Sequence, residues 1–133
     1  ALKKIDEEII LSEFIKNKPE SEKSARDIES RRLQRAGVVI AVLSTPIDHP
    51  SIPKWEMQLS TGAVCMNLLS SAQSKGYAAQ WLTEWYAYNE KMLTTLGGTI
   101  GKDKIAGFIY IGHKKEEPLE RKRPDPQNII NYL

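Results

Sequence analysis

Residues 55–85 read WEMQLSTGAVCMNLLSSAQSKGYAAQWLTEW, and this stretch decides the fold. Its first part predicts one long helix over about Lys54–Lys75. Gly76 is suited to end that helix, because glycine adopts the left-handed conformation at low cost. Residues 77–82 then predict a strand, which leads into an aromatic and polar segment, residues 80–86. We therefore expect the chemistry of the protein to be organised around this joint between a long helix and a strand.

The long helix is unusually rich in small residues. Large apolar residues and small ones share its surface in two stripes, formed by Trp55, Leu59, Ala63, Met66 and Leu69 and by Val64 and Leu68. A helix that is apolar on more than one side is buried on more than one side. Gly62 inside a helix costs about 1 kcal/mol relative to alanine, so a close packing contact is expected there. The residues leave two alternatives open, a core helix of one domain and a helix at a homodimer interface.

The aromatic and polar segment after the second strand, Gln80–Tyr86, also has two interpretations. Planar side chains and backbone groups at the end of a strand suit a flat heteroaromatic ligand. Trp81 and Trp85 would equally serve to cover one edge of a core. The lone Cys65 is expected to be a small buried residue and not a nucleophile.

The flanking sequence predicts further helices and strands. Apolar spacing predicts a helix over residues 2–16, and continuous apolar runs predict strands over 36–43 and 104–112. A second, polar helix is expected over 21–35, and a short helix over 89–96. The run at 36–43 is typical of a central strand covered on both faces. Gly97–Gly101 is interpreted as a helix stop and turn. The alternation suggests layered α/β packing, but three strands form a thin sheet for this much helix, so we expect strands to be missing or supplied by a partner.

Composition limits the class of protein. The 133 residues are expected to form one domain, 1–133. The net charge is +2, and the basic residues are interspersed with acidic ones, which argues against a nucleic-acid partner.

The cations Arg31, Arg32 and Arg35 are interpreted as a solvated face, with phosphate binding as the alternative. One cysteine and two isolated histidines predict no disulfide and no metal site, and no apolar run is long enough to cross a membrane. A cytoplasmic protein is expected.

Five segments in order carry a resemblance to a known family. They are the apolar strand 37–43, HPSIPKWE at 49–56, Ser-x-Gly-Ala at 60–63, GYAAQWLT at 76–83 and KIAGFIYIG at 104–112. Together they resemble the FMN-dependent nitroreductase family, and within it the compact single-domain NAD(P)H nitroreductases. The resemblance covers essentially the whole chain.

The resemblance implies an α+β fold with a mainly antiparallel sheet packed between helices. It also implies an intertwined homodimer with the long central helix at the interface and FMN in a cleft between the subunits. By similarity, Trp81, Leu82 and Thr83 line the flavin, and the end of the helix from Ser71 to Gly76 meets the nicotinamide cofactor. Arg123, or its neighbour Arg121, falls near the flavin phosphate. No side chain is implied as an acid–base catalyst.

The implied activity is an FMN-dependent oxidoreductase that uses NAD(P)H to reduce nitroaromatic, quinone or similar acceptors. Family members begin with an Arg-Arg-Ser element that holds the flavin phosphate, followed by a proline–tryptophan strand, and neither is present here. We therefore expect an N-terminally truncated chain. The alternative is a non-catalytic dimeric interaction domain or an inactive fragment that lacks this flavin-binding element.

Overall fold

The computed structural model describes residues 2–117 and 119–131. A helical N-terminal segment contains α1 (Leu2–Ile5), a π-helical turn η1 (Asp6–Leu11), α2 (Ser12–Asn17), α3 (Lys23–Glu29) and η2 (Arg32–Gln34). The chain continues through β1 (Val38–Ser44), α4 (Lys54–Ser74), β2 (Ala78–Leu82), η3 (Trp85–Tyr88), α5 (Glu90–Thr95), β3 (Lys104–Gly112) and η4 (Pro126–Asn128). The predicted long helix and the three predicted strands are thus confirmed.

The three strands form an antiparallel sheet in the order β1-β3-β2. This arrangement confirms the α+β fold and corrects the layered α/β packing that alternation suggested. It also shows that the prediction of 36–43 as the central strand is wrong, because β3 is central and β1 lies at an edge. Phe108 and Ile109 of β3 are fully buried, whereas Val38 of β1 is half exposed. An apolar run in the sequence predicts a strand, but it does not tell whether that strand lies in the middle of the sheet or at its edge.

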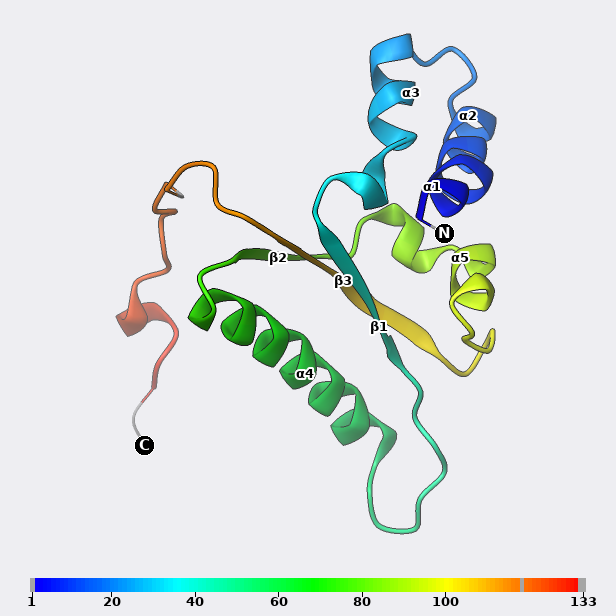
Figure 1. Ribbon diagram of the computed structural model, residues 1–133. Helices are drawn as coiled ribbons and strands as arrows, with labels where there is room; N and C mark the ends of the chain where they lie inside the picture. Colours follow the sequence, from blue (N-terminus) through cyan, green and yellow to red (C-terminus); the bar gives the residue numbers. More distant parts are fainter. Residues whose placement is uncertain (1, 118, 132–133) are drawn as a thin grey trace.

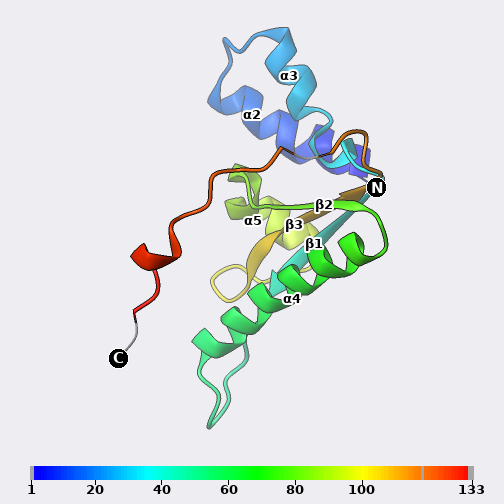
Figure 2. The same cartoon turned by 90° about the vertical axis from the view of Figure 1, so that its left-hand side faces the viewer.

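Helices cover the two faces of the sheet (Figures 1 and 2). The long helix α4 packs on one face, and the N-terminal helices with η3 and α5 lie on the other. The main core lies on this second face, and its buried members are Ile9, Ile10, Leu33, Tyr86, Ala87, Met92, Leu93, Ile105 and Phe108. Ile109, equally buried, lies outside this cluster, as expected for neighbours on opposite faces of a strand.

The end of α4 follows from Gly76. Its φ of 81° is left-handed, and it allows the Tyr77 N–H to donate to Ala72 O (3.0 Å) while the Gly76 N–H donates to Gln73 O (2.9 Å). This pair of bonds is a Schellman motif, which satisfies carbonyls that a helix end leaves free. The same pattern at Gly97 and Gly98 ends α5, so the predicted helix stop there is also confirmed.

The predicted helix over 21–35 is divided in the structure. It ends at Glu29, and a short 3-10 turn, η2, follows. The cause is Asp6, a fully buried carboxylate that accepts from the Leu33 N–H and from Gln34 Nε2, both at 2.9 Å. A buried acceptor from a distant segment thus replaces the helical hydrogen bonding of this turn.

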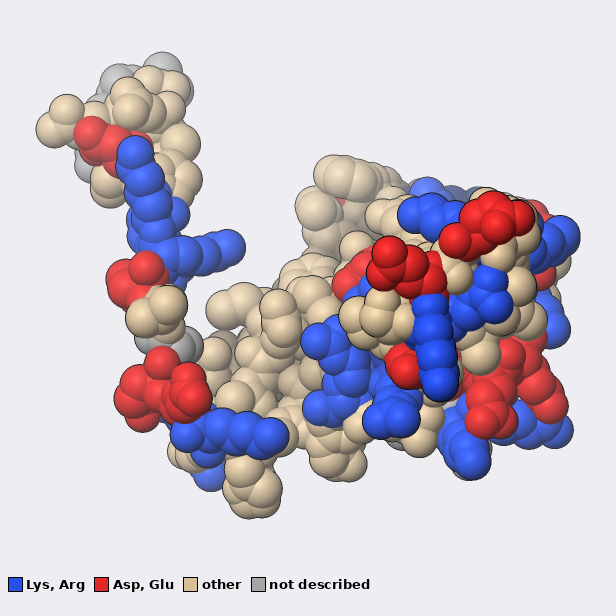
Figure 3. All heavy atoms as spheres, turned by 90° about the horizontal axis from the view of Figure 1, so that it is seen from above, with Lys and Arg blue, Asp and Glu red and all other residues tan. Residues whose placement is uncertain are grey.

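The segment after β3 forms an arm that leaves the body (Figures 1 and 3). Residues 114–117 and 119–131 run along it, and Ile129 and Ile130 near its end are exposed. On the face in Figure 3, basic and acidic side chains are interspersed over the body and the arm.

We predict that Gly107→Ala lowers the free energy of unfolding by about 1–3 kcal/mol, the usual cost of overpacking. A Cβ at Gly107 would collide with the indole Nε1 of Trp81, and the φ of 157° there is itself unfavourable for a residue with a side chain. Urea unfolding measures the change. Gly37→Ala is the matched control, because its Cβ would lie 3.8 Å from its nearest neighbour, Ile111 O. Equal stability of the two variants would contradict this packing.

Candidate functional site

Trp81 lies where the sheet, α4 and the end of β2 meet. Its indole Nε1 donates to Ala106 O at 3.0 Å, and the ring lies against the backbone of Gly107, which leaves space for it. The far edge of the ring approaches α4, since a Cβ at Gly62 would lie 3.9 Å from Trp81 Cη2. A Cβ at Gly62 would thus make an ordinary van der Waals contact, so the close packing expected at Gly62 is not found within the described residues of this chain.

The end of β2 is open and not sealed inside the subunit. The Trp81 side chain is about a third exposed, Leu82 is half-buried and Thr83 is exposed. One edge of β2 pairs with β3, and its other edge pairs with none of the described strands. We call Trp81, Leu82 and Thr83 the open corner. It offers a partly exposed aromatic ring beside unpaired backbone donors and acceptors.

The chain turns sharply after the open corner. Glu84 has φ 57° and ψ 172°, a conformation that side-chain-bearing residues rarely adopt. Its carboxylate accepts from Arg32 Nη1 at 3.5 Å, and Arg32 Nη2 donates to Glu29 at 2.6 Å. The hydrogen bond to Glu29 is the main cause that raises the pKa of Arg32, against the opposing effect of burial.

Two tyrosines continue this polar cluster into the core. The hydroxyl oxygens of Tyr86 and Tyr110 lie 2.8 Å apart in a hydrogen bond. Burial is the first cause that raises the pKa of both phenols, and for Tyr86 the bond to Tyr110 adds to it. Both phenols are therefore held neutral.

The structure does not bring the other predicted site residues to the open corner. Ser71 and Gly76 are exposed at the far end of α4. The helical rise of 1.5 Å per residue puts Ser71 about 14 Å along the axis from Gly62. Arg123 lies on the arm, where its Nε donates to Glu120 at 3.0 Å.

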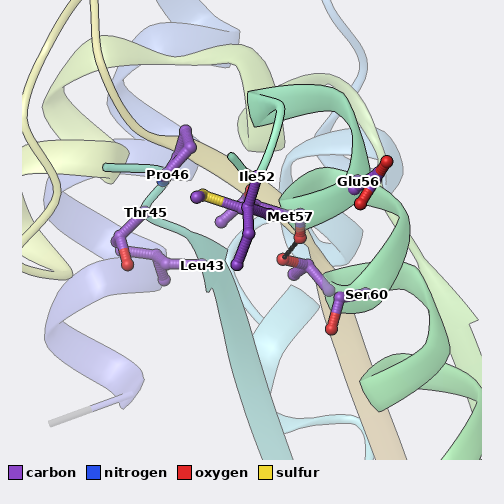
Figure 4. Close-up of a pocket in the computed structure, with 9 residues that line it drawn as sticks. Leu43, Thr45, Pro46, Ile52, Glu56, Met57 and Ser60 are labelled. Carbon is purple, nitrogen blue, oxygen red and sulfur yellow. Dashed lines mark hydrogen bonds between the residues drawn. The ribbon is translucent and has the colours of Figure 1, made fainter. Parts of the chain in front are cut away.

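Sequence reasoning missed a cavity of about 490 Å³ between the end of β1, the following loop and α4 (Figure 4). Ile52 and Met57 lie in the middle of the lining group, and Glu56 and Ser60 lie along the helix. None of the predicted site residues lines it. The loop is held by His49, whose Nδ1 accepts from the N–H groups of Ser51 and Ile52 at 3.2 and 3.0 Å. This isolated histidine therefore has a structural contact within the loop.

Sequence reasoning also missed the contact of Arg32 with Glu84. The two residues are 52 positions apart, and Arg32 was interpreted as part of a solvated charged face. No pattern of neighbouring residues in the sequence predicts a contact between residues so far apart. Cys65 is fully buried, and burial raises the pKa of its thiol, which is the opposite of what a nucleophile requires.

Residues 2–117 and 119–131 contain neither a metal-binding cluster nor a membrane-crossing helix. Within them, no three His, Cys, Asp or Glu residues come together as a metal site. Among the helices of the same residues, none combines the length and apolar character that crossing a membrane requires.

The fold and the five ordered segments define a class of protein. The model of the family described as "Nitroreductase family" matches residues 2–113, and the chain belongs to this family. The resemblance found in the sequence is thereby confirmed.

Two curated relatives and two solved structures are similar to the chain. It is 28% identical over 104 residues to "Putative NAD(P)H nitroreductase YdjA" of Escherichia coli strain K12, and equally to that of Escherichia coli O157:H7. These matches cover 74% of this chain and 54% of each relative, so the chain spans about half the length of the curated relatives it matches.

The solved structures support the fold alone, because their identities are low. A nitroreductase-like family protein from Bacillus cereus aligns with a TM-score of 0.67 and 20% identity, over 85% of this chain and 62% of that one. The enone reductase CLA-ER, from a gut-bacterial fatty acid saturation metabolism, aligns with a TM-score of 0.53 and 22% identity, over 91% of this chain and 53% of that one.

The two neutral phenols predict a loss of stability at alkaline pH. Their pKa values are raised in the fold, so they contribute fully below the unfolded value near 10. Above that pH the unfolded chain releases these protons while the folded chain keeps them, so the free energy of unfolding falls, by up to about 1.4 kcal/mol per pH unit for each phenol.

Urea unfolding between pH 8 and pH 11, approximate limits that span the ordinary tyrosine pKa, measures this loss. The variant Tyr86→Phe/Tyr110→Phe removes both hydroxyls of the pair, which is close to neutral for stability at lower pH, and is expected to shrink the alkaline loss. The exposed Tyr88→Phe is the control and is expected to keep it. A double variant with the full wild-type loss would contradict the assignment.

Proposed function

We propose that the intact protein is a flavin-dependent oxidoreductase that binds FMN at the open corner and takes electrons from NAD(P)H. The observation that carries this proposal is a family match over residues 2–113 that coincides with an exposed aromatic strand end. When bound, the flavin would supply the redox chemistry that connects a nicotinamide donor to a nitroaromatic, quinone or similar acceptor.

The residues at the open corner fit a flavin. An isoalloxazine is flat, with an apolar benzenoid end and a polar pyrimidine edge, and sites for such ligands combine apolar walls with a few placed polar groups. The Trp81 ring, held by Ala106 and Gly107, offers a rigid apolar wall. Leu82 and Thr83 offer backbone groups at the free edge of β2 for the polar side of the ring. These residues would orient the flavin and exclude water from one side of it.

We also propose that a second copy of the chain covers α4. Along one side of this helix, Trp55, Leu59 and Met66 are each more than half exposed. Full burial of one large apolar side chain is worth about 1.5–3 kcal/mol, so three on one stripe favour association. The interface alternative from the sequence is the one that this exposure supports.

A second copy of the chain would also matter for the two other proposed cofactor contacts. Ser71 to Gly76 are proposed to meet the nicotinamide cofactor, and Arg123 the flavin phosphate. Within one protomer both lie away from the open corner, and the arm carries Arg123 outward. A role for Arg123 at a flavin phosphate therefore requires the open corner of the other copy.

The second candidate is a non-catalytic dimeric interaction domain. The observation that favours it is the same apolar stripe on α4, which would drive association with or without flavin.

We predict that the intact protein purifies with, or takes up, FMN. It is expected to show a flavin absorbance spectrum that NAD(P)H bleaches. At free FMN of about one hundred times Kd, binding would add about 2.7 kcal/mol to the free energy of unfolding and so raise Tm. A colourless dimer whose Tm does not respond to FMN would favour the interaction domain and contradict the enzyme.

We predict that Met66→Lys weakens self-association, because it places a charge in the proposed apolar interface. Analytical ultracentrifugation of the intact protein measures the dimer dissociation constant, with an increase of about tenfold or more expected. Asn67→Lys is the matched control, since it adds the same charge at the neighbouring exposed position of α4. Equal dimerisation of the two variants would contradict the proposed interface.

A further inference from the structure

Glu84 is the one non-glycine residue with a positive φ among residues 2–117 and 119–131. Such a conformation is strained for a residue with a side chain and persists only where surrounding contacts enforce it. Glu84 directly follows Thr83, the last residue of the open corner. The direction of the backbone at the open corner thus depends on the contacts that keep Glu84 at its positive φ.

The holding contacts come from the N-terminal helical layer. Arg32 lies between two carboxylates, with Nη1 3.5 Å from Glu84 Oε1 and Nη2 2.6 Å from Glu29 Oε1. On the other side of the turn, the indole Nε1 of Trp85 donates to Glu29 Oε2 at 3.4 Å. The strained residue and its neighbour are therefore both tied to one ion pair, Glu29–Arg32.

This ion pair is firmly placed. The Glu29 side chain is 6% exposed and that of Arg32 is 19% exposed. Removing one member of a buried pair leaves an uncompensated charge, so such pairs resist separation. Arg32 opens η2, the turn that Asp6 fixes through Leu33 and Gln34. The contacts of Arg32 thus connect the N-terminal helical layer to the turn that follows the open corner.

We propose that Arg32 is a positioning residue for the flavin site. It holds Glu84 in its left-handed conformation and thereby sets the direction of Thr83 and the free edge of β2, without itself touching the flavin. This inference rests on the proposed function.

Side-chain changes at Arg32 have room in the structure. A cavity of about 390 Å³ adjoins the pair and is lined by Phe14, Asn17, Lys18, Glu29, Arg32 and Trp85. A shorter or neutral side chain at position 32 would leave Glu29 accessible to water from this cavity. We therefore choose Arg32→Met as one variant, and Glu84→Gly as a second variant that keeps the ion pair with Glu29.

The experiment measures the FMN dissociation constant, the flavin reduction potential and Tm in the intact protein. Arg32→Met is expected to weaken FMN binding about tenfold or more, by analogy with the loss of residues that support metal ligands, and to shift the flavin reduction potential. Glu84→Gly is expected to weaken FMN binding similarly while Tm stays equal or rises, because glycine adopts this φ without strain. Combining the two is expected to cost little more than either alone.

The control is Arg26→Met, a half-buried arginine of the same layer whose Nε donates to Ser21 at 3.1 Å. It is expected to lower Tm and leave the FMN dissociation constant unchanged. A wild-type protein that binds FMN, with Arg32→Met and Glu84→Gly within twofold of it, would overturn the positioning role alone. A wild-type protein that binds no FMN would overturn the proposed function, and the positioning role with it.

Discussion

The contact between the Trp81 indole and the backbone of Gly107 is the constraint on which the arrangement depends. The ring occupies the space that a side chain at position 107 would take, and its N–H is fixed on Ala106 O. Because the ring also approaches Gly62, one side chain sets the spacing of α4, β2 and β3. An added side-chain atom at Gly107 would collide with the ring, whereas one at Gly62 would only make ordinary van der Waals contact with it.

The two faces of the sheet differ in character. The face under the N-terminal helices is filled by large side chains, including Tyr86 and Phe108, whose rings meet edge to face with centroids 5.0 Å apart. The face under α4 is covered by smaller residues, among them the buried Cys65 and Ala72. A helix seated on small residues keeps its larger apolar side chains on the outside, which explains why Trp55, Leu59 and Met66 are exposed. The large buried side chains therefore gather mainly on the face under the N-terminal helices, and the exposed apolar stripe lies on the outside of α4.

The sequence predicted what local chemistry controls. The end of α4 at Gly76 and the turn at Gly97 follow from glycine conformation, and the spans of β1 and β3 follow from apolar runs. It mispredicted the lateral order of the strands, because pairing is decided by contacts between distant segments. It also missed Arg32, whose partner Glu84 is far away in the chain, and it did not predict that the neighbour of Gly62 within the chain is Trp81. Strained backbone at Glu84 leaves no signature in a sequence, since only surrounding structure enforces it.

The most direct test is a diffraction structure of the intact protein crystallised with FMN. The account predicts an isoalloxazine against Trp81, Leu82 and Thr83, with the apolar stripe of α4 covered by a second copy. A structure in which that strand end is covered by its own polypeptide, or in which FMN binds elsewhere, would contradict the account.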